Sequence, residues 1–210
     1  MEERKIYEGF KKMGGEHISD LGAYVREYLS KHNDVKVYIG IDSEQHKRHT
    51  TYGMVVILYH DKKGGHLIFK RDNAHDENGK RIKIKDMFTK LWKEVELAAE
   101  LGEYFEQELE GHYKRLSIEE LSNMRDCRGN VYGVHQTKLV DVDLDLNPDG
   151  GKFGKNKSCK VHDTAVSYIS GLGYRVRTKP YAWAASVAAD LVVDKSNPVK
   201  RKSNKISTFI

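Results

Sequence analysis

The stretch Val37–Gln45, with the sequence VYIGIDSEQ, decides how the rest of the chain is interpreted. It begins with β-branched and aromatic residues, which favour a buried strand. The apolar run then stops at a carboxylate, Asp42, which polar residues follow at once. Burying a carboxylate at the end of a central strand costs free energy unless a positive group meets it. Asp42 therefore either caps a turn or is a metal ligand.

Composition limits the class of protein to which this chain can belong. Its 210 residues predict a single domain, and no stretch resembles a transmembrane span or a signal peptide. The cysteines, Cys127 and Cys159, have no metal-type spacing, so we expect a reduced, cytoplasmic protein without a membrane partner. A net charge of +5 and a pI near 9.0 favour a polyanionic partner such as nucleic acid.

The periodicity of the sequence predicts a mixed α/β domain. Three strands come in succession and are separated by turn-forming residues, which favours an antiparallel meander. The expected order is β-β-β-α-β-α-β-α. After the opening strand at Val37, the elements are strands at Thr51–His60 and His66–Lys70, a helix at Lys85–Glu108, a strand at Lys138–Leu146, a helix at Ser158–Gly171, a strand at Tyr174–Lys179 and a helix at Tyr181–Val193.

Other segments lie outside this order of elements. Residues Met1–Gly15 are polar and contain several glycines, which predicts a loose leader. Ser19 or Asp20 is placed to cap a helix that follows it. The predicted organisation is a leader and helix over residues 1–34, a domain over 35–194 with an irregular insertion at about 110–136, and a flexible basic tail over 195–210.

Two acidic residues stand in unusual positions on the predicted helices. Glu94 borders the apolar stripe of the long helix, where it either joins the buried face or extends to solvent. Asp190 is a lone charge in a helix made mostly of alanine and valine. It is either a buried functional carboxylate or a helix-end residue at the surface.

The strand predicted at Lys138–Leu146 carries alternating aspartates. Asp141, Asp143 and Asp145 share one face, and apolar residues share the other. Three carboxylates in a row repel one another. The acidic face is therefore either exposed at the surface, or it lies beside Asp42 and requires cations.

Carboxylates from separate elements can together hold divalent ions. Hard ions such as Mg²⁺ prefer carboxylate oxygens and water. Two such ions about 3.5–4 Å apart can activate a water and stabilise a leaving oxygen in phosphodiester hydrolysis. The candidate ligands of two Mg²⁺ or Mn²⁺ ions are Asp42, Glu94, Asp190 and either Asp143 or Asp145.

Three motifs together resemble one known family. They are IGIDSE at residues 39–44, LDLN at 144–147 and KPYAWAASVAAD at 179–190. They resemble the YkuK-like family of RNase H-related proteins, and the resemblance runs from about Val35 to about Val193. It implies an RNase H-like fold, which is a mixed β-sheet flanked by helices, with a metal-dependent nuclease centre.

The resemblance also implies which residues form that centre. By position, Asp42 matches the first-strand aspartate, Asp145 the fourth-strand aspartate and Asp190 the acid of the last helix. Glu94 matches the helical glutamate, with Glu96 in reserve.

This sequence differs from the family pattern at two positions. Asp143 stands where the family often has histidine, and Glu44 stands where it tends to have glutamine. The extra negative charge either recruits a further ion, which makes Asp143 an additional metal ligand, or weakens the approach of a phosphate.

Basic residues near the predicted centre are candidates for contacts with a nucleic-acid backbone. Their loop and strand-end positions suit a phosphate, but they suit plain solvation as well. His162 either shuttles a proton at the rim of the site or lies on a helix surface. The candidate backbone-binding residues are Lys152, Lys155, Lys157 and Lys179.

Three functions are compatible with these features. The first is a divalent-metal-dependent nuclease acting on RNA, an RNA–DNA hybrid or structured DNA. The second is a catalytically inactive RNase H-like module that binds nucleic acid, because one fold can host many functions. The third is a structural protein whose acidic strand face docks a basic surface.

Overall fold

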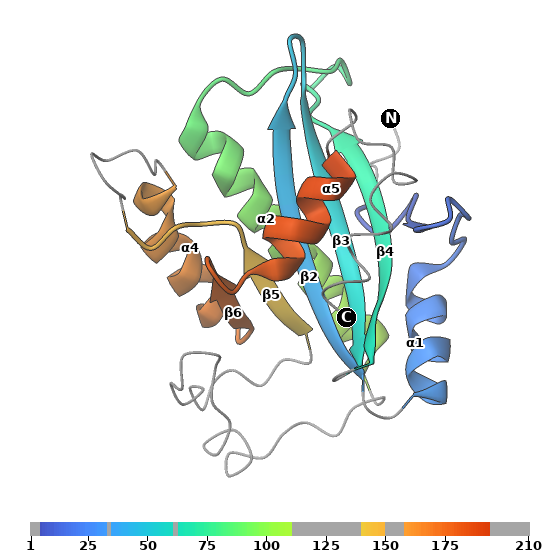
Figure 1. The fold of residues 1–210 in the computed structure, drawn as a ribbon. Coiled ribbons are helices and arrows are strands. Elements are labelled where there is room, and N and C mark those ends of the chain that lie inside the picture. Colours follow the sequence, from blue (N-terminus) through green and yellow to red (C-terminus); the bar gives the residue numbers. More distant parts are fainter. Residues whose placement is uncertain (1–4, 33–34, 61–62, 111–139, 150–157, 194–210) are drawn as a thin grey trace.

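The computed structural model describes residues 5–32, 35–60, 63–110, 140–149 and 158–193 (Figure 1). Within them, a six-stranded sheet lies between two layers of helices. Helix α2 packs against one face of the sheet, and α5 crosses the other face in front of the central strands (Figure 1). The predicted order of strands and helices is confirmed, including the helix expected after Asp20, and one short further strand precedes that helix.

The strand order in the sheet is β1-β4-β3-β2-β5-β6. The strands β2, β3 and β4 form the predicted antiparallel meander, and β5 and β6 run parallel to β2. The strands are β1 (Lys11–Lys12), β2 (Val35–Gln45), β3 (Thr50–His60), β4 (Gly64–Asn73), β5 (Val140–Leu144) and β6 (Arg175–Thr178). The helices are α1 (Leu21–Lys31), α2 (Met87–Glu108), α4 (Cys159–Gly171), the π-helix η2 (Ala184–Ala189) and α5 (Asp190–Val193).

The central strand β2 is longer than its sequence pattern suggested. The apolar run stops at Asp42, but pairing with β3 continues to Gln45, which lies opposite Thr50. Asp42 itself pairs with Gly53. Backbone hydrogen bonding of the hairpin, rather than side-chain polarity, thus determines where this strand ends.

The two faces of β2 bury different cores. Ile39 and Ile41 belong to the large core, which also contains apolar residues of α1, α2 and α4. Tyr38, on the opposite face, packs with Ala184 and Ala188 of η2 in a smaller core. Successive side chains of a strand point to opposite faces, so β2 connects both cores.

The N-terminal segment is less loose than its composition suggested. Ile6 and Phe10 are buried in the large core, and Lys11–Lys12 pairs with β4. The expectation of a loose leader is therefore corrected for residues 5–15. Asp20 is the N-cap of α1, where its carboxylate accepts a hydrogen bond from Ala23 N at 2.8 Å.

Two further predicted segments are not part of the described structure. The basic tail over 195–210 lies outside the described residues, and so does the insertion at 110–136 apart from its first residue. The domain limits proposed from sequence therefore stay a prediction.

Two glycines allow the last helical segment to lie very close to the sheet. A Cβ atom on Gly40 would lie 2.3 Å from the carbonyl carbon of Ala184. A Cβ atom on Gly53 would lie 2.3 Å from Cγ2 of Val193. Glycine in a strand is typical of such close approaches. It brings η2 and α5 onto β2 and β3 next to Asp42.

Candidate metal centre

Asp42 lies on the face of the sheet that η2 and α5 cover. Gly40, two residues earlier, faces Ala184, and residues two apart in a strand share a face. The parallel pairing of Ile41 with Leu144 places Asp42 and Asp145 at the next step of neighbouring strands. Burial of Asp42, followed by the nearby charges of Asp145 and Asp190, raises the pKa of the Asp42 carboxyl to about 6.

Asp145 already has two partners. The ammonium of Lys179 donates to Oδ2 at 2.8 Å, and the hydroxyl of Ser186 donates to Oδ1. The Asp145 side chain is 19% exposed and that of Lys179 is 36% exposed. A partly exposed ion pair of this kind is weak enough to be exchanged for another cation.

Glu94 reaches the site from α2, on the opposite face of the sheet. It is buried, with 3% of its surface exposed, and it accepts a hydrogen bond from the hydroxyl of Ser43. The ammonium of Lys90 lies 3.8 Å from Oε1 of Glu94 and donates to the Ser43 carbonyl at 3.3 Å. Burial of Glu94, and next the charge of Asp42, raise the pKa of the Glu94 carboxyl to about 8.

The reserve candidate Glu96 has a different environment. It lies half-buried on α2 and forms an ion pair with Lys93 at 3.1 Å. The geometry thus brings Glu94 toward Asp42 and leaves Glu96 at the surface.

Asp190 is exposed rather than buried, which corrects one of the two expectations for it. It is the first residue of α5, directly after the π-helical turns of η2. Ala188 and Ala189 face the sheet, and Asp190 reaches solvent. Its charge still raises the pKa of Asp42, so the two carboxylates interact. Short π-helical segments often occur at functional sites.

Each of the three aspartates Asp141, Asp143 and Asp145 pairs with a protein cation, and the two within β5 are the more deeply buried. Asp143 is completely buried, and Arg177 donates to both of its oxygens at 2.7 and 2.9 Å. The backbone N–H of Ala184 adds a third hydrogen bond at 2.8 Å. Asp141 pairs with Arg175, whose Nε donates to Oδ1 at 2.5 Å. Both oxygens of Asp143 therefore already accept hydrogen bonds from strong donors, with which a metal ion would have to compete, and metal binding by Asp143 stays a prediction.

A comparison of the sequence with family models identifies the family of this chain. The sequence model of the family described as Ribonuclease H-like matches residues 17–193, which is most of the chain. The chain belongs to the ribonuclease H-like family. The match confirms the resemblance to YkuK-like RNase H-related proteins and the predicted fold class. It indicates a nuclease-related or nucleic-acid-binding function. No curated protein and no solved structure matches the chain significantly.

The residues of this ribonuclease H-like domain fit divalent ions only in part. In the described ranges, no group of three or more His, Cys, Asp or Glu side chains is close enough to form a complete metal cage. Mg²⁺ does not require one, since it is usually held by one or two carboxylates, waters and substrate phosphates. Burial, and next the neighbouring carboxylates, raise the pKa values of Asp42 and Glu94, and a divalent cation would offset the cost of ionising them.

Among the remaining candidate residues of the ribonuclease H-like domain, the structure describes Lys179 and His162. Lys152, Lys155 and Lys157 lie outside the described residues. Lys179 contacts Asp145, as described above. His162 has partners on both ring nitrogens, Asp163 at 2.8 Å and Thr178 at 3.2 Å. No helix in the described part of the chain has the length and hydrophobicity to cross a membrane.

Sequence reasoning missed the residues that support the carboxylates of the ribonuclease H-like site. Ser43, Lys90 and Ser186 carry no pattern that marks them as partners of Glu94 or Asp145. The cations that pair with the aspartates do follow a pattern. Basic residues alternate along residues 175–179 as the aspartates alternate along 141–145, and each cation lies 34 residues after the aspartate with which it pairs.

Proposed function

We propose that this protein is a divalent-metal-dependent nuclease that hydrolyses phosphodiester bonds in RNA, an RNA–DNA hybrid or structured DNA. The position of Asp42 carries the proposal. It lies beside Asp145 on the neighbouring strand and interacts with Asp190 of α5, and its pKa is raised to about 6. Burial is the main cause of this raised pKa, and a carboxylate buried beside other carboxylates favours a bound cation.

Each carboxylate has a role in the proposed site. Asp42 and Asp145 would hold ions from the sheet, Glu94 from α2 and Asp190 from the solvent side. Two bound Mg²⁺ or Mn²⁺ ions would supply an activated water and stabilise the leaving oxygen. Ser43 and Lys90 position Glu94, since both contact its carboxylate.

Lys179 is proposed to exchange partners when the site is loaded. In the present structure its ammonium offsets the charge of Asp145 at 2.8 Å. An ion bound to Asp145 would weaken that pair, and the ammonium could then contact a phosphate of the nucleic acid. We retain Lys152, Lys155 and Lys157 as proposed backbone contacts.

A second candidate is a catalytically inactive module that binds nucleic acid. One observation favours it: Lys179 and Ser186 together contact both oxygens of Asp145. If these contacts persist when nucleic acid binds, Asp145 has little capacity for a metal ion. Cleavage, rather than binding, therefore distinguishes the two candidates.

The experiment is a cleavage assay on labelled RNA–DNA hybrid, single- and double-stranded RNA and DNA, and a four-way junction. Each substrate is incubated with Mg²⁺, with Mn²⁺ and with chelator. The matched variants are Glu94→Gln and Glu96→Gln, which make the same change two residues apart on α2. We expect metal-dependent cleavage that Glu94→Gln abolishes and Glu96→Gln retains. Binding without cleavage under every ion would favour the inactive module.

A further inference from the structure

The hairpin between β2 and β3 extends beyond the proposed metal centre. The N–H of His46 donates to the carbonyl of His49 at 2.8 Å, so the chain reverses at Lys47 and Arg48. Both of these residues are exposed. Strands rise about 3.3 Å per residue, which puts Lys47 roughly 15 Å from Asp42. The hairpin tip therefore lies well away from the carboxylates, beyond the end of the sheet that carries them (Figure 1).

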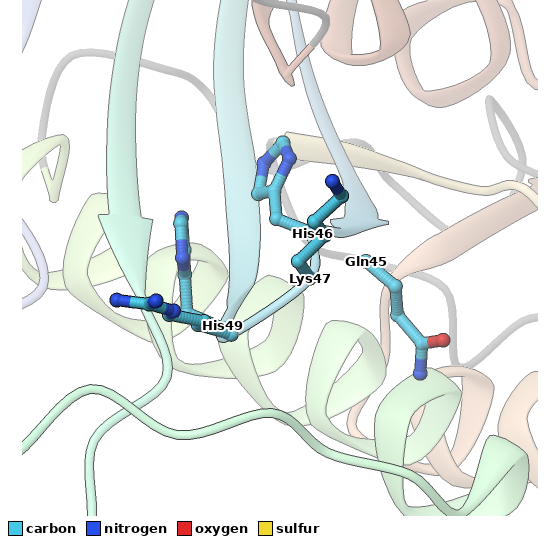
Figure 2. A pocket seen from close by; sticks show the side chains of 5 residues that line it. Gln45, His46, Lys47 and His49 are labelled. Atoms are coloured by element: carbon cyan, nitrogen blue, oxygen red, sulfur yellow. The ribbon is translucent and has the colours of Figure 1, made fainter.

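This hairpin tip borders a pocket that is open to solvent and has no acidic residue among the described residues that line it. The pocket has a volume of about 550 Å³, and Figure 2 shows it with side chains from the turn. Its lining consists of five consecutive residues, Gln45, His46, Lys47, Arg48 and His49. Lysine and arginine are the usual ligands of phosphate groups in nucleic-acid complexes, and glutamine is a further donor.

A ring nitrogen of His46 in the lining makes no hydrogen bond to any residue that the structure describes. The rings of His46 and His49 lie 4.6 Å apart. Nε2 of His46 is buried and makes no hydrogen bond within the described part of the chain. Oε2 of Glu44 lies 3.6 Å from it, which is too far for a hydrogen bond but close enough for an ion pair when His46 is protonated. An oxygen-rich ligand in the pocket would satisfy such a nitrogen.

The base of the hairpin is fixed to the rest of the domain. Gln45 donates its side-chain N–H to the carbonyl of Ile84 at 2.5 Å. Thr50 N donates to the carbonyl of Ile82, and the Thr50 hydroxyl accepts from Ile84 N, both at 3.0 Å. A braced hairpin loses less conformational entropy when it binds a ligand.

We propose that this pocket binds a backbone phosphate of the nucleic acid, at a nucleotide away from the phosphate held at the carboxylates. The inference rests on the proposed function, because the same nucleic acid must occupy both places. Contacts to phosphate fix the register and orientation of the nucleic acid and read no sequence. The hairpin thus determines how the strand lies across Asp42.

The test measures nucleic-acid binding by fluorescence anisotropy between 50 and 200 mM salt, with chelator present so that no substrate is cut. The variants are Lys47→Gln and Arg48→Gln. The control is Lys36→Gln, which removes an exposed charge at the opposite end of β2. Each lost phosphate contact should reduce the slope of log K against log salt by about 0.7–0.9. For a duplex, the loss of affinity across this salt range should become about 3.5-fold smaller.

The outcomes separate this inference from the proposed function. Slopes that fall in Lys47→Gln and Arg48→Gln but not in Lys36→Gln support the pocket, whether or not the protein cuts its substrate. Slopes equal to that of Lys36→Gln overturn the pocket, while metal-dependent cleavage by the unmodified protein would still support the nuclease. Failure of the unmodified protein to bind any nucleic acid overturns both.

Discussion

The ammonium nitrogen of Lys179 lies 2.8 Å from Oδ2 of Asp145, which stands next to Asp42 across the parallel pair β2–β5. A protein cation therefore already contacts one edge of the proposed metal centre. Any divalent ion that binds Asp145 must compete with it. The pair couples metal binding to the position of a lysine that can contact nucleic acid.

This competition predicts opposite effects of one substitution. Lys179→Gln should raise the affinity for Mg²⁺ by about two- to fivefold, because a partly exposed ion pair contributes up to about 1 kcal/mol. The same change should weaken nucleic-acid binding. Calorimetric titration with Mg²⁺ measures the first effect and anisotropy the second. Lys160→Gln, at an exposed position of α4, is the control and should change neither. A weaker Mg²⁺ affinity in Lys179→Gln would contradict the exchange of partners.

The raised pKa values predict how the stability of the metal-free protein depends on pH. Asp42 and Glu94 have pKa values of about 6 and about 8, both above those of an unfolded chain. The folded state therefore holds more protons, so its stability falls as pH rises from about 4 through 8. Asp42→Asn and Glu94→Gln remove these contributions. Thermal melts in chelator should show a smaller fall in Tm between pH 5 and pH 8 for both variants than for the unmodified protein.

Glu96→Gln is the control for these melts, because Glu96 lies at the surface beside Lys93. It should keep the pH profile of the unmodified protein. Comparing each variant with the unmodified protein cancels the other groups that titrate. Identical profiles for Glu94→Gln and the unmodified protein would show that folding does not raise the pKa of Glu94. Saturating Mg²⁺ should flatten the profile of the unmodified protein as well.

Asp143 of β5 and Asp145, the residue directly after this strand, should differ in role. Asp143 is buried between Arg177 and the backbone of Ala184, so Asp143→Ala should destabilise the fold by about 3–5 kcal/mol. The milder Asp143→Asn should lower Tm but leave the Mg²⁺-induced rise in Tm intact. Asp145→Asn should leave the Tm of the metal-free protein nearly unchanged and remove the Mg²⁺-induced rise in Tm. Loss of the Mg²⁺ effect in a folded Asp143→Asn protein would instead support Asp143 as a metal ligand.

The close contact of η2 and α5 with the sheet predicts a steric effect at Gly40. A Cβ atom there would lie 2.3 Å from Ala184 C and 2.5 Å from Ala185 N, and backbone atoms cannot rotate away. Gly40→Ala should destabilise the protein by about 1–3 kcal/mol and reduce the Mg²⁺-induced rise in Tm. Gly171→Ala is the control, since nothing lies within 4 Å of that position. Urea unfolding of both variants measures the difference, and equal stabilities would contradict the packing.

The sequence predicted the order of elements well because each element carried its own local signal. The alternation of β5, the apolar stripe of α2 and the cap at Asp20 depend only on neighbours in the chain. Phe88, the second residue of α2, is 48% exposed and stacks on Trp92.

The candidate site was harder to predict because its partners come from distant segments. The ion pair between Asp143 and Arg177 joins residues 34 apart, through the parallel pairing of β5 with β6. Asp190 is exposed directly after the π-helical turns of η2, and an alanine-rich sequence does not predict such turns. Burial of Phe10 depends on the pairing of β1 with β4. Such contacts between distant segments leave little trace in local composition.

The central claim is that Asp42 holds catalytic divalent ions. The most direct test is the single-turnover cleavage rate as a function of Mg²⁺ concentration, on the best substrate of the panel, for the unmodified protein and for Asp42→Asn. The account predicts a rate that rises with Mg²⁺, vanishes in chelator and is lost in a folded Asp42→Asn protein. Full cleavage by Asp42→Asn, or cleavage that persists in chelator, would contradict it.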